Sequence, residues 1–353
     1  MNIVCNLLFG TWKLYYYLMS PQPKSYLKLG LVVLFLICLV LLSAAIFRPK
    51  VPEPLISPTF LQSFNLTSTF SFVFKSEGLS KIIGDNLAFK DGEYAIYIED
   101  LTDGEKYGLR DLDTFPAASL YKLYLMAAVL KEVENGNLRL DQNVSRKKSY
   151  LVERFGGVDF GYEDIPEDDV IGYSVEEALT RVGRISDNFA SIILADKIGW
   201  EKLQEMADLS GAQNTSIEDP ISTSALDIGE FFKKLYKREI ISGNVSDGII
   251  KYLELNQLNN RIPAGLPEDA KVIHKTGELG RVRNDAGIVW LNSTPGESPS
   301  TTLGTSEPTP GVSSRAYVIV LMSKDLKDED EGVETLAKIS KDVYEYFKKK
   351  YEK

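Results

Sequence analysis

The sequence predicts an α+β fold in which strands lie at both ends of one domain and helices lie between them. Two observations carry this prediction. Stretches rich in β-formers occur near residues 93–110 and again at 270–323, and helical patterns fill the region between. Neighbouring strand patterns favour antiparallel pairing, and the two ends meet in one sheet only if the helical middle packs to one side. We therefore expect an antiparallel sheet flanked by helices, an all-helical lobe, and a substrate cleft between the two.

The first strands and the first central helix follow one another directly. Residues 93–101 and 105–110 flank the turn sequence TDG and predict a β-hairpin. Residues 119–138 place apolar side chains at helical spacing and remain nearly apolar up to Lys131, which predicts a buried helix. Gly136 follows the last periodic residues and is a suitable stop for that helix.

The rest of the domain contains further helical patterns and then returns to strands. Helices are predicted at 174–185, 187–199, 200–211, 222–236 (with Ser222 or Ser224 as N-cap) and 331–350. Strands are predicted at 270–277, 286–291 and 315–323. The stretch 293–314 is rich in Ser, Thr, Pro and Gly with almost no apolar content, so it predicts a low-complexity surface loop.

The N-terminal part predicts a membrane anchor. Residues 29–47 form a run of 19 residues without a charge, which is long enough to span a bilayer core. Lysines precede the run without any acidic residue, and this favours a short cytoplasmic segment at 1–28. The proline-containing stretch 48–75 then predicts a stalk that holds domain 76–353 outside the cytoplasm as a single-pass membrane protein. The alternative is a cleaved signal peptide.

Composition excludes two classes of function. The chain has 353 residues, 44% of them hydrophobic, and a formal net charge of -10. A nucleic-acid partner is not expected, because no basic stripe is present to replace the counterions of a polyanion. One histidine and two cysteines are too few for a Cys/His metal site, so neither a metal nor another cofactor is predicted.

Three short motifs carry the chemistry. Ser119 and Lys122 lie one turn apart at the start of the predicted buried helix. A serine there has its backbone N–H among the unsatisfied donors of the first turn, and burial makes a neutral lysine amine accessible as a base. The other motifs are SDN at 186–188 and KTG at 275–277. Each motif alone is ordinary: a helix start with a snorkelling lysine, a capped turn and a strand end.

Together the three motifs have a known counterpart. S-x-x-K, S-D-N and K-T-G occur in that order, at a helix start, an inter-helix loop and a late strand. The chain resembles the serine β-lactamase and penicillin-binding protein superfamily, most closely the class A β-lactamase branch, over roughly residues 90–350. The stretch 94–144, with its first strands and nucleophile helix, and RNDAGIVWL at 283–291 share this resemblance.

The resemblance implies catalytic roles for four residues. Ser119 would be the acylated nucleophile, and Lys122 would take its proton or tune its field. Ser186 would relay a proton to the departing ring nitrogen. Lys275 completes the predicted catalytic set.

The resemblance also implies substrate-binding roles. Asn188 would hold the side-chain amide of the substrate. Thr276 and Gly277 would lie with Lys275 near the substrate carboxylate, and Arg283 would assist them. The backbone N–H groups of Ser119 and Glu278 would form the oxyanion hole. Glu278 replaces the small residue usual at that position, and its carboxylate would repel an anionic substrate unless it turns away.

The chain departs from the class A pattern in one loop. Class A enzymes carry a glutamate in an E-x-x-L-N setting that activates the water for deacylation. The matching region here, 211–228, has no such motif, and Glu218 and Asp219 are its only carboxylates before the next helix. Glu218 is therefore the candidate deacylation base. Without a positioned base, deacylation loses about 10²–10⁴-fold in rate, so a long-lived acyl-enzyme is expected.

Three functions remain open at this point. The first is hydrolysis of β-lactams with slow deacylation. The second is a D-Ala-D-Ala peptidase or transpeptidase acting on peptidoglycan stem peptides. The third is a sensor that binds β-lactams or wall fragments without hydrolysing them. His274, whose side chain alternates with that of Lys275 along the strand, is expected to face away from the site in a structural role.

Overall fold

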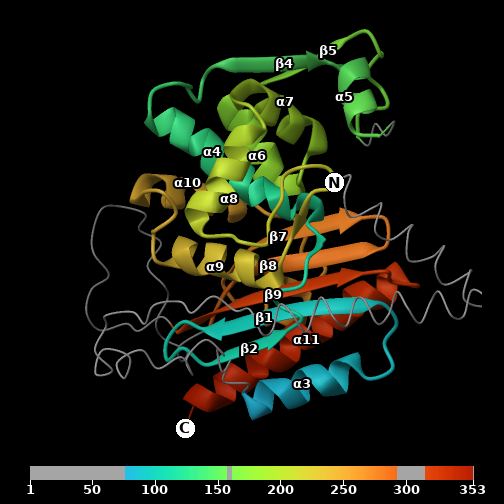
Figure 1. The fold of residues 1–353 in the computed structure, drawn as a ribbon, viewed down its shortest axis with the longest axis vertical. Coiled ribbons are helices and arrows are strands. Elements are labelled where there is room, and N and C mark those ends of the chain that lie inside the picture. Colours follow the sequence, from blue (N-terminus) through green and yellow to red (C-terminus); the bar gives the residue numbers. More distant parts are fainter. Residues whose placement is uncertain (1–75, 157–160, 292–314, 353) are drawn as a thin grey trace, which may run out of the picture. The chain divides into compact units, whose positions relative to one another are not determined.

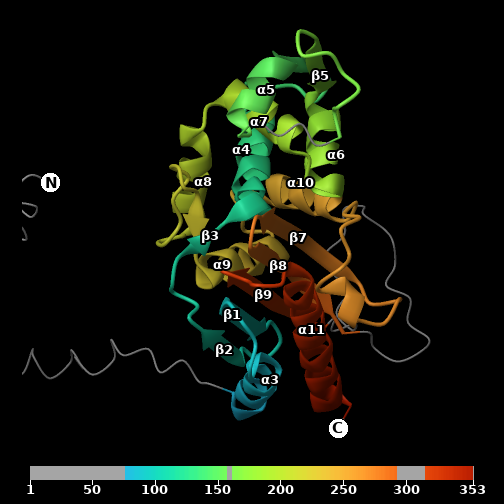
Figure 2. The ribbon, with the colours of Figure 1, turned by 90° about the vertical axis from the view of Figure 1, so that its right-hand side faces the viewer.

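The computed structural model describes residues 76–156, 161–291 and 315–352. The predicted anchor, stalk and low-complexity loop lie outside the described residues. The described part has the predicted α+β architecture: Figure 1 shows a sheet with helices on both faces and a helical lobe beyond it, and Figure 2 shows the same layers from the side. None of its helices is both long and apolar enough to cross a bilayer.

The main sheet joins the two ends of the domain. Its strands pair antiparallel in the order β2-β1-β9-β8-β7. Their bounds are β1 (Glu93–Asp100), β2 (Lys106–Leu109), β7 (Val272–Leu279), β8 (Val282–Trp290) and β9 (Ala316–Lys324). Two small pairs accompany the sheet: β3 (Phe115–Pro116) with β6 (Ser222–Thr223), and β4 (Asn143–Lys147) with β5 (Val170–Ser174). The predicted hairpin and the return to strands near the end of the domain are thus confirmed.

The helices of the lobe come from the middle of the chain, and the first and last helices of the domain pack on the sheet. The helices are α3 (Glu77–Leu87), α4 (Lys122–Glu134), α5 (Lys148–Arg154), α6 (Val175–Ile185), α7 (Asn188–Ile198), α8 (Glu201–Ser210), α9 (Ala225–Tyr236), α10 (Gly243–Leu253) and α11 (Glu329–Tyr351). The short 3₁₀ helices are η1 (Ala118–Tyr121) and η2 (Pro263–Gly265). Of the two N-cap candidates for α9, the structure selects Ser224, whose hydroxyl accepts a hydrogen bond from the Asp227 amide at 3.1 Å.

The two faces of the sheet bury different sets of side chains. On β1, Ile96 and Ile98 pack with α3 and α11, whereas the alternate residues Ala95 and Tyr97 belong to the core shared with α9 and the lobe. This alternation follows from the two-residue period of a strand. Each fully buried Ile side chain contributes about 1.5–3 kcal/mol relative to exposure. The sheet is therefore held on both faces, and β7 is its edge strand beside the lobe.

Helix α4 is the centre of the lobe. Every residue from Lys122 to Leu130 is buried, and the helix contacts α7, α8 and α10. The predicted buried helix is thus confirmed, with one refinement: Ser119 lies in η1, and the α-helix begins at Lys122. The helix ends at Glu134, and Gly136 follows in a left-handed conformation, as a helix stop requires.

Candidate active site

The segment that carries Ser119 is tied to two neighbouring elements. The amide of Ala117 donates a hydrogen bond to Ile221 O at 3.1 Å, and Asn284 Nδ2 donates one to Pro116 O at 3.0 Å. The first bond comes from the loop before α9 and the second from strand β8. Both hold the chain directly before Ser119, so the turn that carries Ser119 is fixed by loop and sheet together.

Two non-glycine residues of the site adopt left-handed backbone conformations. Ala118, immediately before Ser119, has φ 46°, and Ser186, at the C-terminal cap of α6, has φ 57°. Such conformations cost of order 1–3 kcal/mol each in non-glycine residues and persist only where the surroundings determine them. The fold therefore imposes both turns, and each turn presents a serine at the boundary between lobe and sheet.

Lys122 is fully buried, and its Nζ bonds the SDN motif. Its Nζ donates to Ser186 O at 2.6 Å and to Asn188 Oδ1 at 2.6 Å, and it lies 3.4 Å from Ser186 Oγ. Burial lowers the pKa of Lys122 well below its ordinary value, and the nearby positive charge of Lys275 lowers that pKa further, against the opposing effect of Asp187. A neutral amine is therefore accessible at this position, as the sequence predicts.

The SDN turn is rigid because its aspartate is engaged from several sides. Asp187 caps α7 by accepting from the Ala190 amide at 2.9 Å. It also accepts from Arg181 Nε at 2.8 Å and from the Tyr162 hydroxyl at 2.5 Å. These bonds fix the turn from both of its flanking helices, so the hydroxyl of Ser186 is held in one place.

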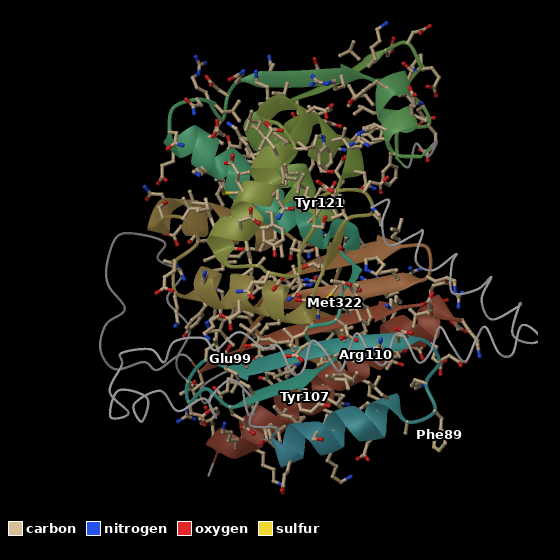
Figure 3. All side chains as sticks on the ribbon, in the orientation of Figure 1. Phe89, Glu99, Tyr107, Arg110, Tyr121 and Met322 are labelled. Carbon is tan, nitrogen blue, oxygen red and sulfur yellow. The ribbon has the colours of Figure 1, made fainter. Side chains whose placement is uncertain are left out.

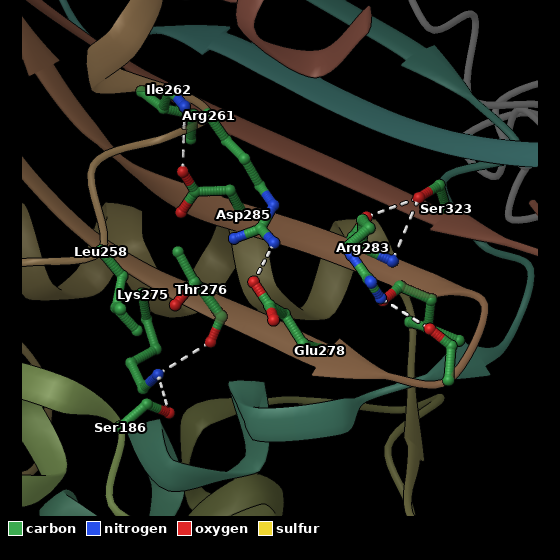
Figure 4. A network of polar contacts seen from close by, with 12 residues as sticks. Ser186, Leu258, Arg261, Ile262, Lys275, Thr276, Glu278, Arg283, Asp285 and Ser323 are labelled. Carbon is green, nitrogen blue, oxygen red and sulfur yellow. Dashed lines mark hydrogen bonds and ion pairs between the residues drawn. The ribbon is translucent and has the colours of Figure 1, made fainter. Parts of the chain in front are cut away.

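Lys275 reaches the same hydroxyl from the sheet. Its Nζ donates to Ser186 Oγ at 2.7 Å and to Thr276 O at 2.7 Å, as Figure 4 shows. Burial lowers the pKa of Lys275 to about 7; Arg261 also lowers it, while Asp285 and Glu278 act in the opposite direction. Ser186 therefore lies between two buried lysines, one from α4 and one from β7.

An aromatic side chain, that of Tyr121, lies beside this cluster. Tyr121 follows Ser119 by two residues, and its hydroxyl pairs with Ser191 Oγ at 3.1 Å. Figure 3 shows Tyr121 where the lobe meets the sheet. Its ring centroid lies 5.9 Å from Lys122 Nζ. The aromatic ring thus forms part of the wall beside the buried amine.

Gly277 allows β7 to approach closely the turn that carries Ser119. A Cβ added at Gly277 would lie 3.1 Å from Ala117 O and 3.3 Å from both Ala118 Cβ and Ser119 N. A side chain there would press on backbone atoms, so the close approach requires glycine. Since Glu278 follows directly, its backbone lies beside that of Ser119, where two N–H groups of an oxyanion hole are predicted.

The side chain of Glu278 turns away from Ser119 and toward an arginine. Arg261 Nη2 donates to Glu278 Oε1 in a close ion pair, drawn in Figure 4. Arg261 is fully buried. Sequence reasoning does not single out Arg261, because it lies in a loop before η2 that has no periodic signal.

The side chain of Arg283 bonds the turn between β7 and β8. Its Nη1 donates to Gly280 O at 2.6 Å and to Val282 O at 2.8 Å, so the guanidinium covers the β7–β8 turn. The role of Arg283 beside Lys275 and Thr276 stays a prediction. Arg261 is a cation that lies near them.

His274 is buried on the far side of β7. Its Nδ1 lies 2.9 Å from Asp285 Oδ1 and its Nε2 lies 3.1 Å from Asn259 Oδ1. A pocket of about 310 Å³ borders this histidine and is lined by residues such as Asn259 and Pro263. Ser119 does not line that pocket, so it is separate from the site around Ser186.

The loop expected to supply a deacylation base presents no carboxylate to the cluster. Glu218 and Asp219 are both exposed, and in the described part of the chain neither side chain makes a hydrogen bond or ion pair with the site. The loop is nevertheless anchored, because the buried Asp227 accepts from the Asn214 amide at 2.7 Å and from Thr215 Oγ1 at 2.8 Å. The loop contacts the site at Ile221, whose carbonyl oxygen accepts a hydrogen bond from the Ala117 amide.

Carboxylates that could hold a metal gather away from the site. Within the described residues, Asp100, Asp103 and Glu105 come close enough together to share an ion. Lys350 Nζ is in ion pairs with all three, at 2.8, 2.7 and 2.6 Å respectively. An internal cation therefore already balances this cluster, which ties α11 to the β1–β2 turn.

Comparisons with known proteins agree on one family. A model described as the β-lactamase enzyme family matches residues 77–296. The imipenem-hydrolyzing β-lactamase of Enterobacter cloacae is 27% identical over 219 residues, which cover 57% of this chain and 72% of that protein.

Solved structures share the fold. An acyl-enzyme complex of a PBP-A mutant with penicillin G has a TM-score of 0.64 and 24% identity, covering 77% of this chain and 96% of that one. A representative class A β-lactamase from Bacteroides cellulosilyticus has a TM-score of 0.63 and 20% identity, covering 77% of this chain and 98% of that one.

Proposed function

The chain belongs to the β-lactamase enzyme family, and we propose that it is a serine hydrolase that opens β-lactam rings through an acyl-enzyme on Ser119 and deacylates slowly. The observation that carries this proposal is the meeting of Lys122 and Lys275 at Ser186, with both amines buried. A structural ion-pair network would hold these lysines charged beside carboxylates. Here their partners are hydroxyl, amide and carbonyl oxygens, and burial lowers both pKa values.

In the proposed acylation, these groups act in turn. Ser119 Oγ attacks the carbonyl carbon while its proton passes to the neutral amine of Lys122. The oxyanion accepts from the backbone N–H groups of Ser119 and Glu278. The C–N bond of the ring then breaks. The departing nitrogen takes a proton from the Ser186 hydroxyl, which takes one in turn from Lys122, 3.4 Å away. The amine of Lys122 is neutral again at the end of the step.

The substrate is oriented by the remaining motif residues. Lys275 and Thr276 lie at the carboxylate end, where the charge of Lys275 is sensitive to pH near neutrality because its pKa is about 7. Asn188 is proposed to hold the side-chain amide of the substrate through its Nδ2, since its Oδ1 accepts from Lys122. Asn188 thus accepts from Lys122 through Oδ1 and donates to the substrate through Nδ2.

A second candidate function is a D-Ala-D-Ala peptidase or transpeptidase acting on peptidoglycan stem peptides. The exposed positions of Glu218 and Asp219 favour it, because acyl-enzymes of β-lactams would then persist for lack of a positioned base. The likeness in fold to PBP-A is consistent with this alternative.

One experiment separates the two candidates. The purified chain is mixed with a penicillin and followed over time by intact-mass spectrometry, with Ser119→Ala as control. We expect a mass increase of one penicillin that decays slowly with release of hydrolysed drug. In parallel, release of D-alanine from a stem pentapeptide is measured; release together with a permanent penicillin adduct would favour the peptidase. No adduct with any penicillin would overturn the proposed β-lactam reaction.

We also propose that residues 29–47 anchor the chain in the membrane, with domain 76–353 on the outer side. The support is the uncharged run and the lysines before it. Fractionation of cells producing the full chain is expected to place it in the membrane fraction, accessible to added protease. A soluble form shortened at its N-terminus would show cleavage instead.

A further inference from the structure

Arg261 is a buried cation whose hydrogen-bonding capacity is mostly unused. Its side chain is 0% exposed, and in the part of the chain that the structure describes its Nε and Nη1 have no hydrogen-bond partner. Only Nη2 is engaged, by Glu278. A buried guanidinium with two unsatisfied donors is costly, and it calls for an additional anion with more than one acceptor.

A second carboxylate near Arg261, that of Asp285, is engaged by other groups. Asp285 accepts from the Ile262 amide at 3.0 Å through Oδ2 and pairs with His274 through Oδ1 at 2.9 Å. Both of its oxygens are therefore in use. Within the described residues, Glu278 is the single ion-pair partner of Arg261.

Arg261 lies on one face of β7 with Thr276, which is predicted to bind the substrate carboxylate. Thr276 and Glu278 alternate with Lys275 and Gly277 along β7, so their side chains leave the strand on the face where Arg261 lies, as Figure 4 shows. The charges of Arg261 and Glu278 both act on the pKa of Lys275, in opposite directions. The ion pair therefore lies within electrostatic reach of Lys275.

The two partners differ sharply in their contact with water. The side chain of Glu278 is 52% exposed, whereas that of Arg261 is completely covered. A half-exposed carboxylate loses little when it moves into water, because solvent replaces its partner. The guanidinium has no such alternative and needs an anion at all times. The pair is thus built so that Glu278 can leave when another anion takes its place.

Resting on the proposed function, we propose that Glu278 is a specificity-determining residue that occupies the anion-binding position of Arg261. An acyl donor with a carboxylate at this edge of the site binds Arg261 only after it displaces Glu278. A donor that is neutral at this edge meets no such competition. The site therefore discriminates against anionic β-lactams relative to neutral acyl donors of the same shape.

The test compares one acyl donor in two charge states. Benzylpenicillin and its methyl ester are mixed separately with the purified chain, and the second-order acylation rate constants come from intact-mass time courses. The measured quantity is the ratio of the anion rate constant to the ester rate constant. Glu278→Gln removes the charge and keeps the shape and the backbone N–H. It is expected to raise this ratio about tenfold or more, the size of one charge-assisted hydrogen bond.

Two controls keep the result specific. Glu205→Gln makes the same change in net charge on the exposed surface of α8 and should leave the ratio unchanged. Glu278→Ser, with its thermal unfolding midpoint measured, repeats the test with a smaller side chain. If wild type and both Glu278 variants acylate with the same ratio, the inference is overturned and the proposed function stands. If no variant acylates with either compound, both are overturned.

Discussion

Lys275 Nζ donates a hydrogen bond to Ser186 Oγ at 2.7 Å, and this bond joins the sheet to the helical lobe at the proposed reaction centre. The lysine comes from β7 and the serine from the turn between α6 and α7. Lysine and serine are both ordinary residues when each element is considered alone. The chemistry arises because the fold buries the amine and holds the hydroxyl against it.

Removal of the nucleophile is the first prediction. Ser119→Ala should abolish the penicillin adduct, because no other hydroxyl in the proposed mechanism attacks the carbonyl carbon. Ser119 is only partly buried, so the thermal unfolding midpoint should change little. Intact-mass spectrometry checks the first point and thermal unfolding the second. A persistent adduct in this variant would assign the nucleophile to another residue.

Removal of the base amine should separate activity from folding. Lys122→Met keeps a long buried side chain but has no amine, so acylation should fall by about 10²–10⁴-fold. The variant leaves Ser186 O and Asn188 Oδ1 without a donor, so some loss of stability is expected as well. Urea unfolding measures that loss. An acylation rate within threefold of wild type in a folded variant would contradict the role of Lys122.

The pKa of Lys275 predicts how stability depends on pH. Lysine in the unfolded chain has a pKa near 10.4, whereas the folded value is about 7. Between these values the unfolded state binds the proton and the folded state does not, so stability rises with pH from about 7 to 10. The contribution is up to about 1 kcal/mol per pH unit. Urea unfolding at pH 7, 8 and 9 should show this slope. Lys275→Met should reduce the slope without abolishing it, because the lowered pKa of Lys122 contributes in the same direction.

The same titration predicts how activity depends on pH. Above pH 7 Lys275 becomes neutral and attracts an anionic substrate less strongly. Acylation by benzylpenicillin should therefore decrease through this range, relative to acylation by its methyl ester. Lys275→Arg, which stays charged, should remove that difference in the pH profiles. Identical profiles for the two compounds in wild type would argue that Lys275 does not meet the carboxylate.

The deacylation loop gives the last prediction. Glu218→Gln and Asp219→Asn should each change the lifetime of the acyl-enzyme by less than about threefold, because both carboxylates are exposed and away from the cluster. The lifetime is read from the decay of the adduct mass after excess penicillin is removed. A prolongation of about 100-fold in either variant would identify that residue as the base.

The elements whose apolar residues follow a regular pattern could be predicted from the sequence. The β1–β2 hairpin has a turn between alternating stretches, and the apolar run after Ser119 gives the buried helix α4. Helix α3 and the small β4–β5 pair were outside the predicted set, because short or mixed patterns leave the choice of element to tertiary packing. The stretch at 29–47 stays a prediction.

The residues of the site also divide into those that the sequence predicts and those that it does not. The three motifs could be predicted because their residues are close in sequence and occur in the expected order. Arg261 could not, since its position beside Glu278 depends on how the loop before η2 folds back onto β7. Arg283 is close to KTG in the sequence, but such closeness does not fix where a long side chain lies. Its Nη1 bonds the carbonyl oxygens of Gly280 and Val282 in the nearby turn.

The pairing of β1 with β9 also governs how the chain acquires its shape during synthesis. Glu93 at the beginning of the domain pairs with Lys324 near its end. The amino-terminal hairpin therefore leaves the ribosome with an open edge, and its partner emerges only after the entire lobe. Such distant pairing slows folding and exposes an edge to other chains. A chain that stops before Ala316 would lack that partner and should aggregate rather than persist as a smaller enzyme.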